Sequence, residues 1–276
     1  AIIRGGIELL RRGDMSFSTL LLRREKHVLF ITLNRPERMN SLNEAMYADL
    51  LAAFAGVEGD EDTRVVVLSG AGDAFCTGAD LSGDEGGEKV LDVQPLEERR
   101  WRLRQGPQRV IAMLYNLGVP TIAMVNGHAV GAGFDLALAC DLRTGCEHSR
   151  LAIGFTRLGL VPASGASWLL PRVVGFARAS EIILGGGTVH PEEAFRMGLL
   201  NRLVPAAQLE EETMSLAGKI AAHPPVGVRM AKFNLRQGMK MDLEGALEML
   251  AASQAVALDT DEHRTALAAW RQKRKR

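Results

Sequence analysis

A glycine-rich turn that ends in an acid gives this 276-residue chain its clearest chemical pattern. Residues 126–136 read Asn-Gly-His-Ala-Val-Gly-Ala-Gly-Phe-Asp-Leu, with an apolar run before the turn and a helical pattern after it. Glycines let a backbone approach a ligand closely, and free N–H groups at a helix N-terminus attract negative charge. The turn can therefore hold an oxyanion beside Asp135, although a strand-to-helix turn needs small residues in any α/β protein.

Strand patterns surround this turn and favour an α/β architecture. Residues 20–22 and 28–33 are rich in β-formers and predict a hairpin around a charged turn at 23–26. Residues 65–70 and 120–125 are nearly continuous apolar runs, which are typical of strands buried on both faces. The repetition of strand, turn and helix units along the chain is the basis of this prediction.

Helical repeats occupy much of the remaining chain. Ser41 precedes one helix and Glu44 is placed for a capping box, while a second helix is expected over 97–116. From Glu192 onward the pattern is mainly helical. A module boundary is therefore expected near residue 200.

Composition excludes several classes of partner. Lys+Arg and Asp+Glu both number 33, so no whole-chain field favours nucleic acid or a membrane surface. Cys76, Cys140 and Cys146 make an odd count without metal-ligand spacing, which predicts free thiols in a reducing compartment. No apolar run is long enough to span a bilayer, and no metal site is indicated. A cytoplasmic protein is expected.

Two familiar active-site patterns do not fit the turn. A dinucleotide-binding fingerprint would need its third glycine at Leu136, and no suitably placed acid follows. A serine hydrolase using Ser164 or Ser167 with His128 would need a nucleophile elbow, and that spacing is missing.

Four ordered motifs resemble the crotonase, or enoyl-CoA hydratase/isomerase, superfamily of acyl-CoA enzymes. They lie at Leu33–Pro36 with Asn40–Leu42, at Ala74–Leu81, at Asn126–Gly133 and at Leu158–Pro162. The resemblance implies a spiral of ββα repeats over residues 15–200 and a C-terminal helical trimerisation region over 201–276. Residues 1–14 are expected to be a leader or an appended extension.

The resemblance also implies a site and a ligand. The backbone N–H groups of Ala79 and Ala132 would bind the oxygen of an acyl-CoA thioester. Coenzyme A would enter as part of the substrate, without a separate cofactor, and the protein would be a homotrimer or a dimer of trimers. The residues expected to contact CoA or the acyl group are Arg35, Arg38, Met39, Gly78, Asp80, Leu81, Ser82, Gly131 and Phe155. Arg35 and Arg38 could equally be surface charges.

The expected acids depart from the hydratase pattern. By the resemblance, glutamates would stand at two positions that here hold Asp135 and Phe155. Two-acid hydration needs both carboxylates to hold and activate water, whereas a double-bond shift needs one base to move one proton. Isomerisation with Asp135 as acid/base is therefore favoured over hydration. An apolar pocket would raise the pKa of Asp135 and the helix N-terminus would lower it, and the sequence leaves that balance open.

Several alternatives stay open at this level. The acid could instead come from Asp84 or Glu85, in a charged, glycine-containing segment. The protein could be a catalytically weak acyl-CoA-binding member, since Phe155 replaces an acid. Thioester hydrolysis and decarboxylation would use the same oxyanion hole. The acyl chain is not specified.

Overall fold

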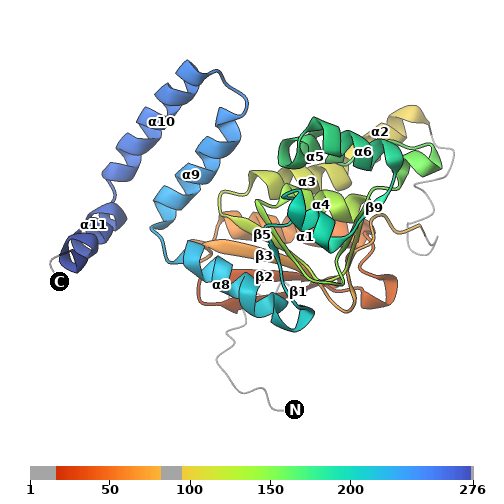
Figure 1. Ribbon diagram of the computed structural model, residues 1–276, viewed down its shortest axis with the longest axis horizontal. Helices are drawn as coiled ribbons and strands as arrows, with labels where there is room; N and C mark the ends of the chain where they lie inside the picture. The colour runs from red at the N-terminus through yellow and green to blue at the C-terminus, as the bar shows by residue number, and fades with distance from the viewer. Residues whose placement is uncertain (1–16, 82–94, 275–276) are drawn as a thin grey trace, which may run out of the picture.

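The computed structural model describes residues 17–81 and 95–274, which form two sheets surrounded by helices (Figure 1). The larger sheet has the order β1 (Leu20–Glu25), β2 (Val28–Leu33), β3 (Val65–Gly70), β5 (Thr121–Val125), β7 (Leu142–Gly145), β10 (Arg202–Leu203). The smaller sheet has the order β4 (Ala74–Cys76), β6 (His128–Val130), β8 (Arg150–Ala152), β9 (Thr188–Val189). Neighbouring strands are parallel except in the pairs β1–β2 and β8–β9.

The chain supplies the two sheets alternately. Strands β3, β5 and β7 enter the larger sheet, and each is followed by a strand of the smaller sheet, namely β4, β6 and β8. Helices complete each repeat. They are α2 (Leu96–Gln105) with α3 (Pro107–Asn116), then α4 (Ala132–Ala139), then α5 (Ala166–Val174) with α6 (Phe176–Gly185). This arrangement is a spiral of ββα turns and confirms the expected α/β architecture.

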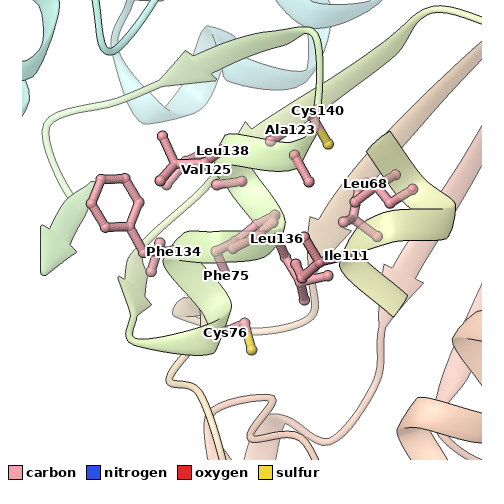
Figure 2. Close-up of a cluster of buried hydrophobic side chains, with 14 of the residues drawn as sticks. Leu68, Phe75, Cys76, Ile111, Ala123, Val125, Phe134, Leu136, Leu138 and Cys140 are labelled. Carbon is pink, nitrogen blue, oxygen red and sulfur yellow. The ribbon is translucent and has the colours of Figure 1, made fainter. Parts of the chain in front are cut away.

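Helix α4 lies in the centre of the core. All of its residues are buried, and Figure 2 shows its Leu136 close to Phe75 from the smaller sheet and Ile111 from α3. A helix that is apolar all round belongs in an interior, so the sequence Ala-Gly-Phe-Asp-Leu-Ala-Leu-Ala suits this position. Asp135 is its one charged residue, and it is buried because the apolar residues around it place the whole helix in the core.

Two predicted boundaries near the N-terminus are wrong. Residues 23–25 continue β1, because Arg23 pairs with Phe30 in the ladder, and the turn is only Lys26-His27. Helix α1 (Glu44–Glu58) is capped by Asn43, whose side chain accepts from the N–H of Met46 at 2.9 Å. Ser41 cannot cap it because Leu42, which follows, is held extended in a bridge to another loop.

The helix expected over 97–116 is two helices. Helix α2 ends at Gln105, and α3 begins at Pro107 after Gly106, whose φ and ψ of −93° and −105° are not helical. Proline has no N–H and clashes with the preceding turn, but it is well tolerated as the first residue of a new helix. The Gly-Pro pair was a local signal for this break.

The C-terminal part is helical, which confirms the predicted pattern. Its helices are α7 (Pro191–Arg196), α8 (Leu209–Ala221), α9 (Pro225–Gly238), α10 (Leu243–Leu258) and α11 (Asp261–Lys273). Helix α8 packs on the larger sheet through Ala217 and Ala221, whereas α9 to α11 extend away from the two sheets (Figure 1). Among the described residues, no helix is long and apolar enough to cross a membrane. Cys76, Cys140 and Cys146 are buried free thiols, as predicted.

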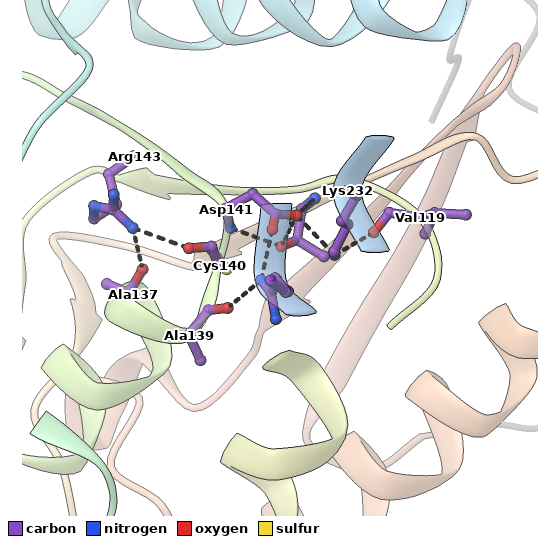
Figure 3. A network of polar contacts seen from close by, with 9 residues as sticks. Val119, Ala137, Ala139, Cys140, Asp141, Arg143 and Lys232 are labelled. Atoms are coloured by element: carbon purple, nitrogen blue, oxygen red, sulfur yellow. Dashed lines mark hydrogen bonds and ion pairs between the residues drawn. The ribbon is translucent and has the colours of Figure 1, made fainter. Parts of the chain in front are cut away.

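A buried charge network joins α9 to the core (Figure 3). The Lys232 ammonium lies 2.7 Å from an Asp141 carboxylate oxygen and donates to the carbonyl of Val119 at 2.6 Å. The Arg236 guanidinium lies 2.5 Å from the other Asp141 oxygen. The N–H of Thr121 also donates to Asp141, at 2.8 Å. These cations and hydrogen bonds hold the pKa of Asp141 below its usual value despite the opposing effect of burial.

Asp141→Ala is expected to destabilise the protein by about 3–5 kcal/mol, because removal of one partner leaves a buried charge without compensation. The Lys232 ammonium is the buried charge that would lose its carboxylate partner, since that side chain is only 7% accessible. Urea denaturation measures the change. Glu181→Ala is the control, because its ion pair with Arg178 is exposed and its loss should cost less than about 1 kcal/mol. Equal losses in the two variants would contradict the role given to the buried network.

Candidate active site

The segment 77–81 lies against the segment 35–42 through a short parallel bridge. The N–H of Leu42 donates to the carbonyl of Gly78 at 2.7 Å, and the N–H of Asp80 donates to the carbonyl of Leu42 at 3.0 Å. Successive backbone groups along an extended chain point to opposite sides. Because the bridge uses the groups of Gly78 and Asp80, the N–H of Ala79 points away from it.

Two glycines bring this segment next to the start of α4. Gly78 has a φ of 89°, and a Cβ placed there would lie 3.3 Å from the nitrogen of Ala132 and 2.8 Å from the carbonyl oxygen of Val130. Gly131 has a φ of 56° and forms the N-cap of α4. Side chains other than hydrogen are strained at such φ values. The sequence therefore needs glycine at both positions where the segment 77–81 passes the start of α4.

Ala132 is the first residue of α4, so its N–H has no acceptor within the helix. Its location at the N-terminus also places it at the positive end of the helix dipole. The N–H groups of Ala79 and Ala132 thus come from two neighbouring segments, which are separated by two helices and two strands along the described chain. Such a pair of donors can bind a carbonyl oxygen that gains negative charge.

Asp135 lies one turn further along α4 with no exposed surface. Its two carboxylate oxygens are buried and make no hydrogen bond of normal geometry with the described residues. Burial raises the pKa of Asp135 to about 7, and the nearby backbone of Ala166 and hydroxyl of Ser164 oppose this rise. An unpaired carboxylate with this pKa can take up or release a proton near neutral pH.

Phe155 covers the other side of the turn. A Cβ on Gly131 would lie 3.3 Å from the tip of the Phe155 ring, so ring and turn are in close contact. Phe155 begins the short 3₁₀ helix η4 (Phe155–Leu158) and packs partly buried against the main core. At this position the sequence resemblance led us to expect an acid in a hydratase. The ring supplies an apolar wall there and no carboxylate.

The residues expected to contact CoA fall into two groups. Arg38, Met39 and Leu81 are exposed beside the Ala79 segment. Arg35 and Asp80 are mostly buried and form an ion pair with each other at 2.9 Å. Ser82, with the loop acids Asp84 and Glu85 and the expected leader 1–14, lies outside the described residues.

Two side chains near Asp135 were not assigned to the site from the sequence. Ser164 comes from the loop before α5, and Tyr47 is a half-buried residue of α1. Burial raises the pKa of the Tyr47 phenol, and the neighbouring Cys76 and Asp135 add to this effect. Both residues are far from Asp135 along the chain, and no local pattern indicates their proximity. Only the tertiary structure shows it.

The fold and the turn define a class of spiral ββα enzymes, and comparison with known proteins identifies the family. The model of the enoyl-CoA hydratase/isomerase family matches residues 23–276. The chain belongs to this family, which confirms the resemblance seen in its motifs and its assignment as an enzyme.

Relatives named as hydratases and relatives named as isomerases both match nearly the whole chain. A short-chain-enoyl-CoA hydratase of Clostridium acetobutylicum is 30% identical over 95% of this chain and 97% of its own length. A 1,2-epoxyphenylacetyl-CoA isomerase of Escherichia coli is 33% identical over 91% of this chain and 94% of its own length. The crystal structure of an enoyl-CoA hydratase from Bacillus anthracis superposes with a TM-score of 0.87 at 33% identity, covering 93% of this chain and 97% of that one.

Proposed function

We propose that this protein binds an acyl-CoA thioester, stabilises its enolate and moves a double bond by proton transfer. The observation that carries the proposal is Asp135, a buried and unpaired carboxylate on the same helix whose first N–H belongs to Ala132. Similarity to relatives whose names include CoA thioesters supports this substrate class.

The backbone donors would stabilise the charge that the reaction creates. When a base removes a proton from carbon next to the thioester or conjugated with it, the electron pair moves onto the thioester oxygen. The N–H groups of Ala79 and Ala132 are proposed to donate to that oxygen. One preorganised donor of this kind lowers a barrier by about 2.7–4 kcal/mol.

Asp135 would act first as base and then as acid. Its carboxylate takes a proton from one carbon of the enoyl group, and the resulting acid returns a proton to another carbon. The double bond has then moved and the carboxylate is restored, without consumption of water. A pKa of about 7 suits both halves of this exchange.

Phe155 favours isomerisation over hydration in this proposal. Addition of water by the two-acid route needs a second carboxylate to hold and activate the water. The Phe155 ring lies against Gly131 at the expected position and cannot accept a hydrogen bond from water in that way. A slow hydratase is therefore the less favoured form of the same enzyme.

The same ring supports a second candidate, an acyl-CoA-binding member with little catalytic activity. Loss of an acid removes catalysis more readily than it removes a binding site made of backbone donors. Thioester hydrolysis and decarboxylation would also use these donors. In all of these forms, coenzyme A enters as part of the ligand, with the exposed Arg38, Met39 and Leu81 beside it.

Incubation with a panel of CoA thioesters in deuterated water tests the proposal. Mass spectrometry is expected to show deuterium at carbon and a shifted double bond in enoyl substrates. Rapid addition of water without such exchange would contradict the preference for isomerisation. Tight binding without turnover of enoyl, β-hydroxy or malonyl-type thioesters would support the binding candidate.

The pH profile gives a separate prediction. Because Asp135 must begin as a carboxylate, kcat/KM should rise with pH around a midpoint near 7 and then level off. An ordinary aspartate would instead be fully ionised from about pH 5 upward. Initial rates across pH 5 to 9 measure the midpoint. A flat profile from pH 5 to 7 would contradict Asp135 as the base.

We also propose that the chain assembles as a homotrimer or a dimer of trimers. Large apolar side chains are exposed on the helices that extend from the sheets, including Leu235 at 74% and Leu243 at 73%. Exposed apolar surface of this kind marks a protein interface. Sedimentation equilibrium distinguishes a trimer or hexamer from a monomer, which would contradict the proposal.

A further inference from the structure

We infer that Arg35 positions the proposed oxyanion hole through Asp80 and that its guanidinium is not a contact for coenzyme A. The inference rests on the proposed function, because it concerns how the N–H of Ala79 is held. It replaces the expectation from the sequence that Arg35 and Asp80 bind the ligand.

One guanidinium reaches both chains of the bridge that orients Ala79. Arg35 Nη2 donates to Asp80 Oδ2 at 2.9 Å, on the segment that carries Ala79. Arg35 Nη1 donates to the carbonyl of Ser41 at 2.7 Å, on the opposing segment next to Leu42. The planar group therefore sets the separation of the two chains beside the bridge between Leu42 and Ala79.

Burial makes this ion pair unlike a surface pair. The Arg35 and Asp80 side chains are only 12% and 3% exposed. A pair sheltered in this way is screened little by salt or water. Since the guanidinium nitrogens already point to Asp80 and Ser41, this charge serves the protein's own loops.

The Arg35 backbone is fixed as well. Its N–H donates to the Asn40 side-chain oxygen at 2.9 Å, and its carbonyl accepts from the N–H of Asn40 at 2.9 Å. The Asn40 amide in turn donates to the carbonyls of Ala71 and Ala74, both at 2.8 Å. These contacts tie the Arg35 loop to the strand that leads into Gly78. Asp80 is thus held from a rigid support.

A lysine cannot replace this arginine. Its ammonium is a point charge on a flexible stem, whereas the guanidinium fork reaches two acceptors at fixed separation. A shift of the Ala79 N–H by about 1 Å would weaken its bond to the developing oxyanion, and misplacement of that size can cost about 100-fold in rate. The loss should fall on turnover, because the charge on the oxygen is greatest in the transition state.

Arg35→Lys and Asp80→Asn test the inference. Each is expected to lower kcat for deuterium exchange by about 10- to 100-fold, while the Kd for an unreactive acyl-CoA thioether stays within about threefold of wild type. The double variant should lose little more than either single variant, since both changes break the same contact. Asp80→Asn preserves the side-chain shape and serves if Arg35→Lys does not fold.

Arg24→Lys is the matched control. The Arg24 side chain is also 12% exposed and pairs with Asp60, outside the site. The Arg24→Lys variant should keep wild-type kcat, and this result would distinguish a positioning role of Arg35 from a general loss of stability. Weaker thioether binding with unchanged kcat in Arg35→Lys would instead make Arg35 a CoA contact and overturn the inference. Unchanged kcat in all variants would overturn it too. Wild-type protein without any exchange would contradict the proposed function itself, and the inference with it.

Discussion

Asp135→Asn is expected to lower kcat by about 10²–10⁴-fold, the usual contribution of a positioned acid or base. Asparagine keeps the shape of the side chain but cannot accept the proton from carbon. Binding of the thioester should change little, because the proposed donors to its oxygen are backbone N–H groups. Initial rates give kcat, and calorimetry with an unreactive thioether gives the Kd.

The same substitution should not weaken the fold above neutral pH. The pKa of Asp135 is about 7 in the folded protein against an ordinary value of 3.8, so the native state binds more protons than the unfolded chain between these values. The carboxylate therefore destabilises the native state increasingly as the pH rises from about 4 to 7. At pH 8 the Asn variant should be at least as stable as wild type by urea denaturation.

Asp62→Asn is the control for this experiment, because Asp62 is exposed and lies in the loop before β3. It should leave both kcat and stability unchanged. Wild-type turnover in Asp135→Asn would remove Asp135 from the mechanism and direct attention to the loop acids. A fall in kcat that follows a matching loss of folded protein would show a structural role only.

Ala132→Pro should lower kcat by about 10²–10³-fold, because it removes one of the two proposed oxyanion donors. The backbone can accept this change. Proline is favoured at the first position of a helix, and Gly131 before it has φ and ψ of 56° and −122°. Since glycine is achiral, these angles are the mirror image of the extended conformation that normally precedes proline. A folded variant with its thermal midpoint close to wild type is therefore expected.

Phe176→Pro provides a matched control for the backbone change. Phe176 is the first residue of α6, follows the positive-φ N-cap Gly175, and is highly exposed. Proline there should leave turnover unchanged. Full activity in a folded Ala132→Pro variant would contradict the assignment of its N–H to the oxyanion hole. Deuterium exchange rates on the same thioester allow the two variants to be compared directly.

Local patterns were enough to predict the main elements. Residues 65–70 and 121–125 form the buried strands β3 and β5 because their apolar runs suit strands covered on both faces. The C-terminal helices follow from their own repeats in the same way. The errors arose where another segment decides the outcome, as at Leu42, which pairs with Ala79 and moves the helix cap to Asn43.

The same distinction between local sequence patterns and contacts from distant segments applies to the site. Motif order alone pointed to Ala79, Ala132 and Asp135 as its members, and that assignment stays a prediction until tested. The partners of these residues could not be read from the chain. The resemblance implied that Arg35 and Asp80 contact the ligand, but it did not indicate that their side chains form a buried ion pair with each other. Ser164 and Tyr47 adjoin Asp135 only through packing.

The sequence by itself determined the family, the ββα order and the glycine-rich turn, because these depend on residue types at short spacing. Only the tertiary structure decided the balance at Asp135, which the sequence had left open between an apolar pocket and a helix N-terminus. Desolvation depends on every neighbour from every element that packs around α4, and here it outweighs the hydrogen-bonding groups and raises the pKa to about 7. No local sequence pattern indicates this combined effect on the pKa of Asp135.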